Sequence, residues 1–298
     1  MKGTLSRKII SNLTIIGLIL FCLILPQADA REHSTKTEVK KIEWSGEKEV
    51  TVKMEIGAAK IDLQKSNSGA ILDAEIEYDP DEIAIRADYV KLSDHGKIYL
   101  KTDSREDNVD LGKDGNYWNL QFGDRVPLSF DIEAGACDAD FDFTGVLVKD
   151  LDLELGASTT RVEFRRPNSQ NISEISVDVG ASKLKMLGLG NANFNDMVFD
   201  GGAGDFTLDF SGDFDHTTKV SIDIGIGSLR ILVPEDAGIQ IRKESSFLAS
   251  FSIDEDEFEE VDDDLYENAN FGKTKKELIF NIEAGLGSVR FEYSDGSL

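Results

Sequence analysis

An acidic residue recurs at one fixed place in a short pattern that the chain repeats seven times. The pattern is apolar, acidic, apolar or small, Gly, apolar, small, as in Leu153-Glu154-Leu155-Gly156-Ala157-Ser158. The acidic residues are Glu55, Glu133, Glu154, Asp178, Asp200, Asp223 and Glu283. Carboxylate oxygens are the ligands that Ca²⁺ prefers. Cation binding is therefore the chemistry that these residues offer, provided that the fold brings them together.

The spacing of the repeats predicts how the fold does so. The five central glycines of the pattern are 21, 24, 22 and 23 residues apart. With the two outer copies, the pattern glycines are Gly57, Gly135, Gly156, Gly180, Gly202, Gly225 and Gly285. Units of this length are too short to bury their own apolar face, so they must stack on their neighbours. We interpret these glycines as structural.

Alternation around each glycine identifies the unit as strand. Apolar residues lie two apart before Gly135, at Phe130 and Ile132, and again after it in shifted phase, at Phe141 and Phe143. A period of two is typical of strands, and a change of phase indicates a break. Each repeat is thus expected to be two short strands joined at a glycine, where the backbone adopts an unusual φ and a close neighbour leaves no room for a large side chain.

If adjacent repeats pair in register, the carboxylates lie about 5 Å apart. Like charges at that distance repel unless cations or basic side chains intervene. One hypothesis is that a ladder of these carboxylates binds divalent cations such as Ca²⁺; the candidate ligands are Glu133, Glu154, Asp178, Asp200 and Asp223. The alternative is a solvated face that neighbouring basic residues partly neutralise: Arg161, Lys185, Arg230 and Arg290.

The predicted fold class is all-β, with a β-solenoid-like stacked repeat domain over residues 126–298 and a small antiparallel β module over residues 31–125. Helix content should be low, and the best helical exception is the segment Asp254–Asn268. Within it, residues 254–267 hold ten carboxylates among fourteen residues and form an acidic insertion. Such a block is typical of a solvated or disordered loop.

The first thirty residues have the features of a secretory signal peptide. A basic start with Arg7 and Lys8 precedes the apolar run Leu13–Leu25, and Ala28-Asp29-Ala30 resembles a cleavage site. The alternative is a membrane anchor, but a span needs about 20 apolar residues and this run stops at Pro26. We therefore expect export to the periplasm, cell surface or medium, with no membrane span after cleavage.

Composition excludes several functions. A formal net charge of −25 repels phosphate backbones and argues against nucleic-acid binding. Since Cys22 would leave with the signal peptide, Cys137 has no intramolecular partner and is interpreted as a buried apolar residue. The histidines (His33, His95, His216) are scattered, and the serines after the glycines (Ser158, Ser182, Ser228, Ser288) recur as small structural residues. No catalytic group and no other cofactor is predicted.

One aromatic group leaves two interpretations open. Tyr117-Trp118 and Phe122 could form a sugar-stacking platform, or they could belong to the core or to a module interface.

The repeats resemble a known family. The runs Leu-x-Leu-Gly-Ala-Ser, Val-x-Val-Gly-Ala-Ser and Ile-x-Ile-Gly-Ile-Gly-Ser-Leu are similar to those of bacterial toast-rack cell-envelope proteins. These in turn are similar to the C-terminal domain of LiaF-type stress proteins and to adhesin-type β-repeat families. The resemblance covers most of residues 38–298 and carries no catalytic residues.

The resemblance implies an exported, non-enzymatic binding or scaffold module of the cell envelope. Its partner would be an envelope protein or polysaccharide, and its role would be in envelope stress response or adhesion. The alternative is a carbohydrate-active β-helix enzyme similar to polysaccharide lyases. A groove lined by Lys or Arg with several carboxylates would favour the enzyme, whereas a regular exterior without a pocket would favour the scaffold.

Overall fold

The computed structural model describes residues 35–104, 115–244 and 248–294. These residues belong to one compact unit. The predicted signal peptide lies outside the described residues. Within the described ranges, none of the helical structure has the length and apolar character needed to cross a membrane.

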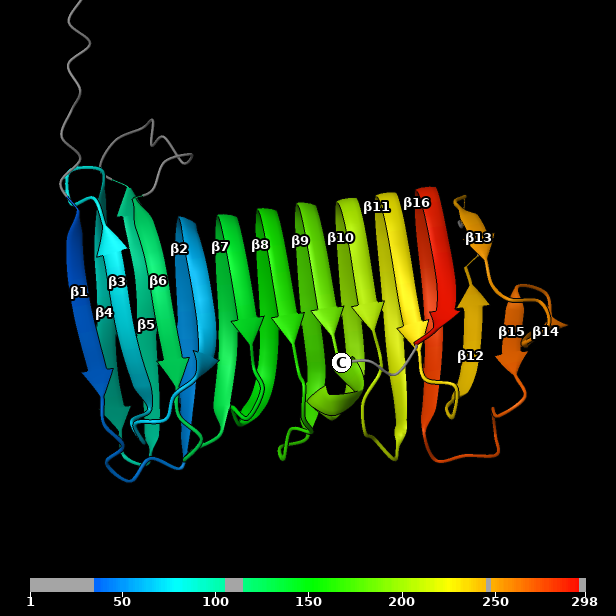
Figure 1. Ribbon diagram of the computed structural model, residues 1–298, viewed down its shortest axis with the longest axis horizontal. Helices are drawn as coiled ribbons and strands as arrows, with labels where there is room; N and C mark the ends of the chain where they lie inside the picture. Colours follow the sequence, from blue (N-terminus) through cyan, green and yellow to red (C-terminus); the bar gives the residue numbers. More distant parts are fainter. Residues whose placement is uncertain (1–34, 105–114, 245–247, 295–298) are drawn as a thin grey trace, which may run out of the picture. The chain divides into compact units, whose positions relative to one another are not determined.

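Seven long strands form the centre of this unit, and all of them pair in parallel (Figure 1). We call each of them a rung. In stacking order they are β2 (Glu49–Lys65), β7 (Leu128–Asp142), β8 (Val148–Glu163), β9 (Ile172–Leu187), β10 (Phe194–Asp209), β11 (Thr217–Val233) and β16 (Glu277–Tyr293). Each rung contains one copy of the repeat, which confirms the predicted all-β stack.

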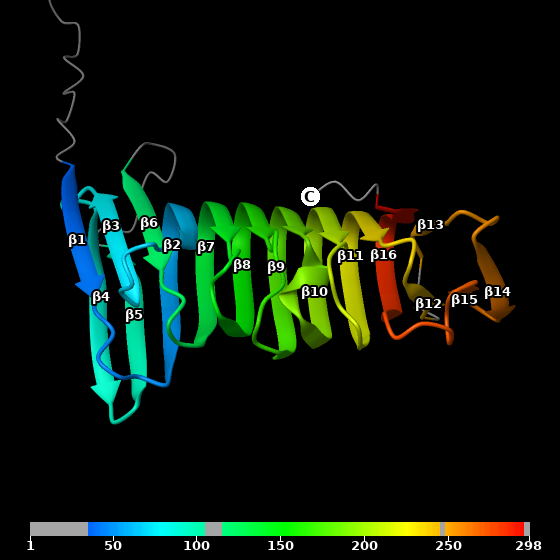
Figure 2. The same cartoon turned by 60° about the horizontal axis from the view of Figure 1, so that its bottom comes forward.

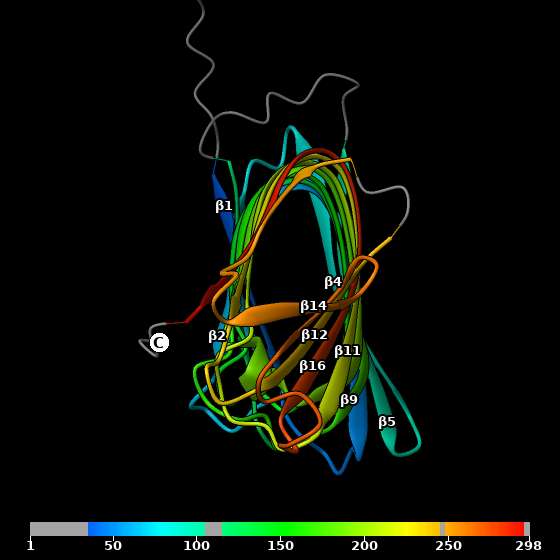
Figure 3. The ribbon, with the colours of Figure 1, turned by 90° about the vertical axis from the view of Figure 1, so that its right-hand side faces the viewer.

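The rungs seen end-on form an arch (Figure 3). The change in burial phase at the pattern glycine places the bend there. The bends lie side by side along one edge of the stack (Figure 2). The residues before the glycine form the first segment of a rung, and those after it form the second segment. In β8, two exposed positions in succession, Gly156 and Ala157, interrupt the strict alternation of buried and exposed residues. This is the predicted change of phase.

The pattern glycines form a row, which we call the glycine row, because the rungs approach closely there. A Cβ on Gly135 would lie 2.5 Å from the carbonyl oxygen of Gly57, and one on Gly180 would lie 2.8 Å from that of Gly156. The expected close neighbour is thus confirmed, but the expected unusual φ is wrong. None of the seven has φ in the left-handed region, and the strand continues through the glycine instead of breaking there.

The core fills the space between the two segments of the rungs. One cluster contains the buried residues of both segments, for example Leu153 and Leu155 before the bend and Val162 after it. Phenylalanines extend this packing. The ring centroids of Phe130 and Phe143, in one repeat, lie 5.1 Å apart, and those of Phe143 and Phe164, which follow successive rungs, lie 5.5 Å apart. Burial of one continuous apolar interior therefore holds the stack together.

The first rung, β2, is the branching point at the N-terminal end. Its first segment pairs with β5 (His95–Ser104), which pairs with β4 (Ile83–Leu92). Its second segment pairs with β6 (Asn116–Phe122), followed by β3 (Leu72–Tyr78) and β1 (Lys36–Ile42). Strands on both sides of residue 125 therefore share hydrogen bonds with β2, and the proposed module boundary there stays a prediction.

At the other end, β16 pairs through its first segment with β12 (Gly238–Lys243) and through its second with β13 (Ser250–Ser252). Beyond β12 lie β15 (Leu265–Asn268) and β14 (Phe258–Asp262). The acidic insertion therefore contains an antiparallel hairpin, so the expected helix and the expected loop conformation are wrong. The expectation that the segment is solvated is confirmed, since residues 254–264 are exposed except for Phe258. Phe258 anchors the hairpin by stacking on Tyr293, with centroids 5.9 Å apart.

Replacing Gly135 by Ala should destabilise the protein by about 3 kcal/mol, because the new Cβ would overlap the backbone of the neighbouring rung. Urea unfolding followed by circular dichroism measures the change. Gly57→Ala is the matched control: it occupies the same place on the first rung, where a Cβ would meet only Thr102 Oγ1 at 3.6 Å. Equal unfolding midpoints for the two variants would contradict the account of the glycine row.

Candidate functional site: an acidic groove beside the glycine row

The seven pattern carboxylates lie in register on neighbouring rungs. Pairing joins Glu55 to Glu133, Glu133 to Glu154, Glu154 to Asp178, and so on to Asp200, Asp223 and Glu283. The residues on either side of each are mostly buried, so the carboxylates project outward from the first segments. We call them the carboxylate row. The in-register pairing predicted from the repeats is confirmed. Metal binding by the ladder stays a prediction.

An open groove of about 620 Å³ follows this row over four rungs. The carboxylates Glu55, Glu133, Glu154 and Asp178 line it together with the adjoining row glycines. Because the glycines carry no side chain, and alanines follow them on these rungs, the surface beside the carboxylates is hollow. Lys101, Thr102 and Asp103 of β5 complete the lining at the N-terminal end.

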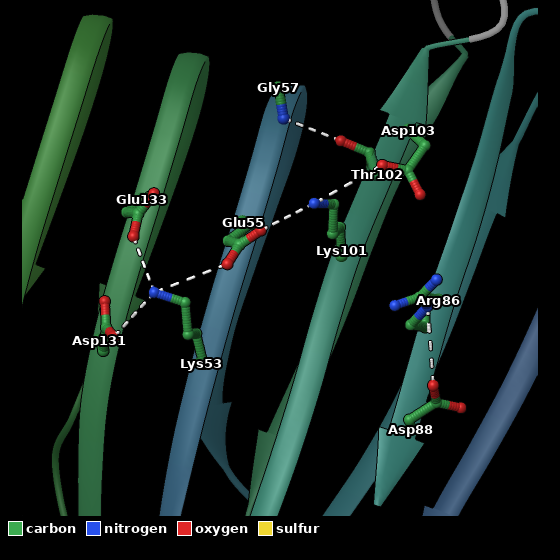
Figure 4. A network of polar contacts seen from close by, with 10 residues as sticks. All are labelled: Lys53, Glu55, Gly57, Arg86, Asp88, Lys101, Thr102, Asp103, Asp131 and Glu133. Atoms are coloured by element: carbon green, nitrogen blue, oxygen red, sulfur yellow. Dashed lines mark hydrogen bonds and ion pairs between the residues drawn. The ribbon is translucent and has the colours of Figure 1, made fainter.

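Two lysines neutralise that end of the groove (Figure 4). Lys53 Nζ lies 2.9 Å from Glu133 Oε1, 3.2 Å from Asp131 Oδ2 and 3.6 Å from Glu55 Oε1. Lys101 Nζ donates to Glu55 Oε2 at 2.9 Å, and this hydrogen bond lowers the pKa of the Glu55 carboxyl. The hydrogen bonds with Glu133 and Asp131 in turn raise the pKa of Lys53.

Thr102 closes the same end of the groove. The backbone N–H of Gly57 donates to its Oγ1 at 2.8 Å, which fixes β5 against the bend of the first rung (Figure 4).

The rest of the carboxylate row lacks such partners. Within the part of the chain that the structure describes, no ion pair reaches Glu154, Asp178, Asp200, Asp223 or Glu283. Burial, followed by the charges of Glu283 and Asp200, raises the pKa of the Asp223 carboxyl. Repulsion along the row is therefore unrelieved over five successive rungs, which makes this face attractive to cations.

The basic residues expected to neutralise the row lie elsewhere. Arg161, Lys185, Arg230 and Arg290 are on the second segments, beyond the bend, where pairing aligns Arg161 with Lys185 and Arg230 with Arg290. Arg161 pairs with Glu163 at 2.9 Å, and Arg230 pairs with Glu292. These basic residues are only a few positions from the pattern carboxylates in the sequence, but the bend places the two sets on different segments of the rung. The neutralising interpretation of these four residues is wrong.

Several other residues singled out in the sequence belong to the interior of the stack. Cys137 is buried, and burial raises the pKa of its thiol. Trp118 and Phe122 are fully buried, so the core interpretation is confirmed for these two rings and they cannot stack on a sugar. Tyr117 is half-buried and donates a hydrogen bond to Asp62. The hydroxyls of Ser158 and Ser182 share a hydrogen bond of 2.5 Å inside the stack.

The described histidines take up local contacts. His95 lies 2.7 Å from both Glu49 and Asp94, and His216 Nε2 contacts the Phe194 carbonyl at 2.8 Å. His33 lies outside the described residues.

One strongly perturbed carboxyl lies away from the groove. Glu47 is buried and accepts hydrogen bonds from Ser45 and from Tyr89 Oη at 2.7 Å, with Lys91 Nζ 3.0 Å away. These contacts outweigh its burial and lower its pKa. Tyr89 and Lys91 belong to β4, so Glu47 ties the segment before β2 to that strand and has a structural role.

Sequence reasoning missed four residues at the N-terminal end of the groove: Lys53, Lys101, Thr102 and Asp103. The position of Lys53, two residues before the first pattern carboxylate, was a usable signal because period two puts both on one face. Lys101 and Thr102 lie outside the repeats and reach the groove only because β5 pairs in parallel with β2.

The fold and groove together define a β-repeat protein built from stacked, bent strands. The family model for the N-terminal domain of toast-rack proteins, DUF2154, matches residues 30–183 and 168–232. These matches span more than half of the chain, which belongs to this family. No curated protein matches it.

Several solved structures are similar to this chain. A candidate cell adhesion protein from Clostridium sporogenes ATCC 15579 is 19% identical, with a TM-score of 0.47, covering 88% of this chain and 100% of that one. A candidate adhesin from Bacteroides fragilis NCTC 9343 is 12% identical, with a TM-score of 0.32 and coverages of 87% and 97%. A candidate lipid binding protein from Parabacteroides distasonis ATCC 8503 is 11% identical, with a TM-score of 0.32 and coverages of 88% and 98%.

Asp223→Asn should raise the melting temperature at about pH 7, and the gain should vanish at about pH 3. The folded-state pKa of the Asp223 carboxyl is raised. The stability that this carboxyl contributes is therefore present below the unfolded-state pKa, where the group is protonated in both states. It is lost as pH rises through the folded-state pKa and the carboxyl ionises, and the Asn variant avoids this loss. Glu55→Gln should do the opposite and lower the melting temperature at neutral pH, since the pKa of Glu55 is lowered. Thermal melts across this pH range, repeated at high salt to screen both effects, provide the check. Shifts of the same sign in both variants would refute the described electrostatics.

Proposed function

We propose that the protein is an exported, non-enzymatic binding or scaffold module of the bacterial cell envelope, located in the periplasm or at the cell surface. The observation that carries the proposal is the groove, whose carboxylates at Glu154 and Asp178 have no cationic partner among the described residues. Continuous parallel pairing and a buried interior make its floor rigid, so little conformational entropy is lost when a partner binds.

The charge of the groove defines the kind of partner it suits. A cationic segment of an envelope protein would meet the carboxylates directly, whereas an acidic polysaccharide would need bridging cations. Either partner is compatible with a role in adhesion or in the envelope stress response. Pull-down against cell-wall, polysaccharide and envelope-protein fractions, with and without Ca²⁺, separates the two. Retention of no fraction by the wild-type protein would argue against a binding module.

We further propose that the ladder Glu133, Glu154, Asp178, Asp200 and Asp223 binds Ca²⁺ weakly. Within the described ranges, no group of three or more Asp, Glu, His or Cys side chains is arranged to hold a metal ion. A cation would therefore contact carboxylates of adjacent rungs and keep several waters, which fits the six to eight oxygen ligands that Ca²⁺ takes. Relief of repulsion along the row would supply the favourable free energy.

Millimolar Ca²⁺ should raise the melting temperature of the wild-type protein above its value in EDTA, because the ion binds the folded row more tightly than the unfolded chain. The increase should shrink in Glu154→Gln/Asp178→Asn. The control is Glu75→Gln/Glu77→Gln, which removes the same charge from exposed positions of β3. Identical midpoints in Ca²⁺ and EDTA, or equal shifts in both double variants, would exclude a cation site in the row.

The alternative of a carbohydrate-active enzyme also has an observation in its favour, since Lys101 and several carboxylates line the groove. Against it, Glu55 and Asp103 lie 2.9 and 3.7 Å from Lys101 Nζ, so the lysine already neutralises acidic neighbours. Incubation with acidic polysaccharides should release no unsaturated products. Release by the wild type and its loss in Lys101→Ala would establish the enzyme instead.

A further inference from the structure

The two ends of the sheet are open and differ in charge. In the described ranges, β1 pairs only with β3 and β14 only with β15, so each has one edge without a neighbouring strand. They lie at opposite ends of the strand order (Figure 1). An unpaired strand edge presents backbone N–H and C=O groups that can extend a sheet.

The β1 edge is basic although the chain as a whole is acidic. Its sequence, KTEVKKI, has three lysines and one glutamate. Strand β4, the other strand at this end that pairs on one side only, carries Arg86 and Lys91 against Asp88. Both strands with an open edge at this end, β1 and β4, therefore carry more basic than acidic side chains.

The β14 edge is acidic. Its sequence, FEEVD, has three carboxylates and no basic residue, and it lies within the run of ten carboxylates at residues 254–267. Of those ten, Asp264 alone forms an ion pair among the described residues, 2.8 Å from Lys243. The hairpin thus holds most of its negative charge without compensation.

Each edge also exposes an aliphatic residue. Val39 in the middle of β1 is 73% exposed, and Val261 of β14 is 49% exposed. Charged edge residues usually prevent association of strands. Here the lysines oppose pairing of β1 with another β1, and the carboxylates oppose pairing of β14 with another β14, but neither opposes pairing of β1 with β14.

We propose that copies of this chain associate head to tail, with the β1 edge of one copy adding to the β14 edge of the next. Lysines of β1 then face carboxylates of β14, the two valines are covered, and backbone hydrogen bonds continue the sheet across the junction. Because the two edges lie at opposite ends, one copy cannot satisfy both by itself. Association is therefore heterologous and open, and it produces linear oligomers.

The test uses sedimentation velocity of the purified full chain at low and high salt. The wild type should form larger species as concentration rises at low salt and dissociate at high salt. Lys40→Glu/Lys41→Glu on β1 and Glu259→Lys/Glu260→Lys on β14 should each weaken association about tenfold or more, since two attractions become repulsions. Circular dichroism melts verify that both variants fold.

Mixing the two variants is the decisive experiment. The first variant is acidic at both edges and the second is basic at both, so each alone should remain monomeric while an equimolar mixture should assemble. A wild type that is monomeric at all concentrations would overturn the proposal. So would a dimer that the β1 reversal abolishes and the β14 reversal leaves intact, because that dimer would join β1 to β1.

Discussion

The contact between each row glycine and the backbone of the preceding rung is the constraint on which the rest of the structure depends. The two segments of a rung can face each other across a core only if the rung bends, and neighbouring rungs can keep hydrogen bonding through the bend only if no side chain intervenes there. A Cβ on Gly202 or Gly225 would lie 2.7 or 2.6 Å from a glycine carbonyl oxygen of the adjacent rung. Glycine is therefore required at this place in every rung after the first.

The same constraint arranges the charge. Because the bends are aligned, the residues two positions before the glycines pair in register from rung to rung, and all seven are acidic. The missing side chains hollow the surface beside them into the groove. The bend also carries the basic residues of the second segments, such as Arg230, to another face, where Glu292 pairs with it. A packing requirement thus produces an acidic surface suited to cationic partners.

Much of this followed from the sequence because the repeat encodes it locally. Period-two alternation and its change of phase identified the bent strands, and the recurring glycines identified the stack. Features that depend on pairing between distant segments did not follow. The hairpin at β14–β15 resembled a loop because its exposed edge is almost wholly acidic, and Lys101 reaches the groove only through the parallel pairing of β5 with β2. The absence of left-handed φ at the row glycines was also hidden, since residue type alone does not distinguish close approach from an unusual backbone conformation.

The central claim is that the carboxylates form one in-register row. Spin labels at positions 133 and 283, five rung spacings apart in the stack, test it most directly by electron–electron distance measurement. With about 4.8 Å between adjacent strands, the account predicts a single narrow distribution centred near 24 Å, allowing for the length of the labels. A broad distribution, or a separation of twice that value, would contradict the stacked register.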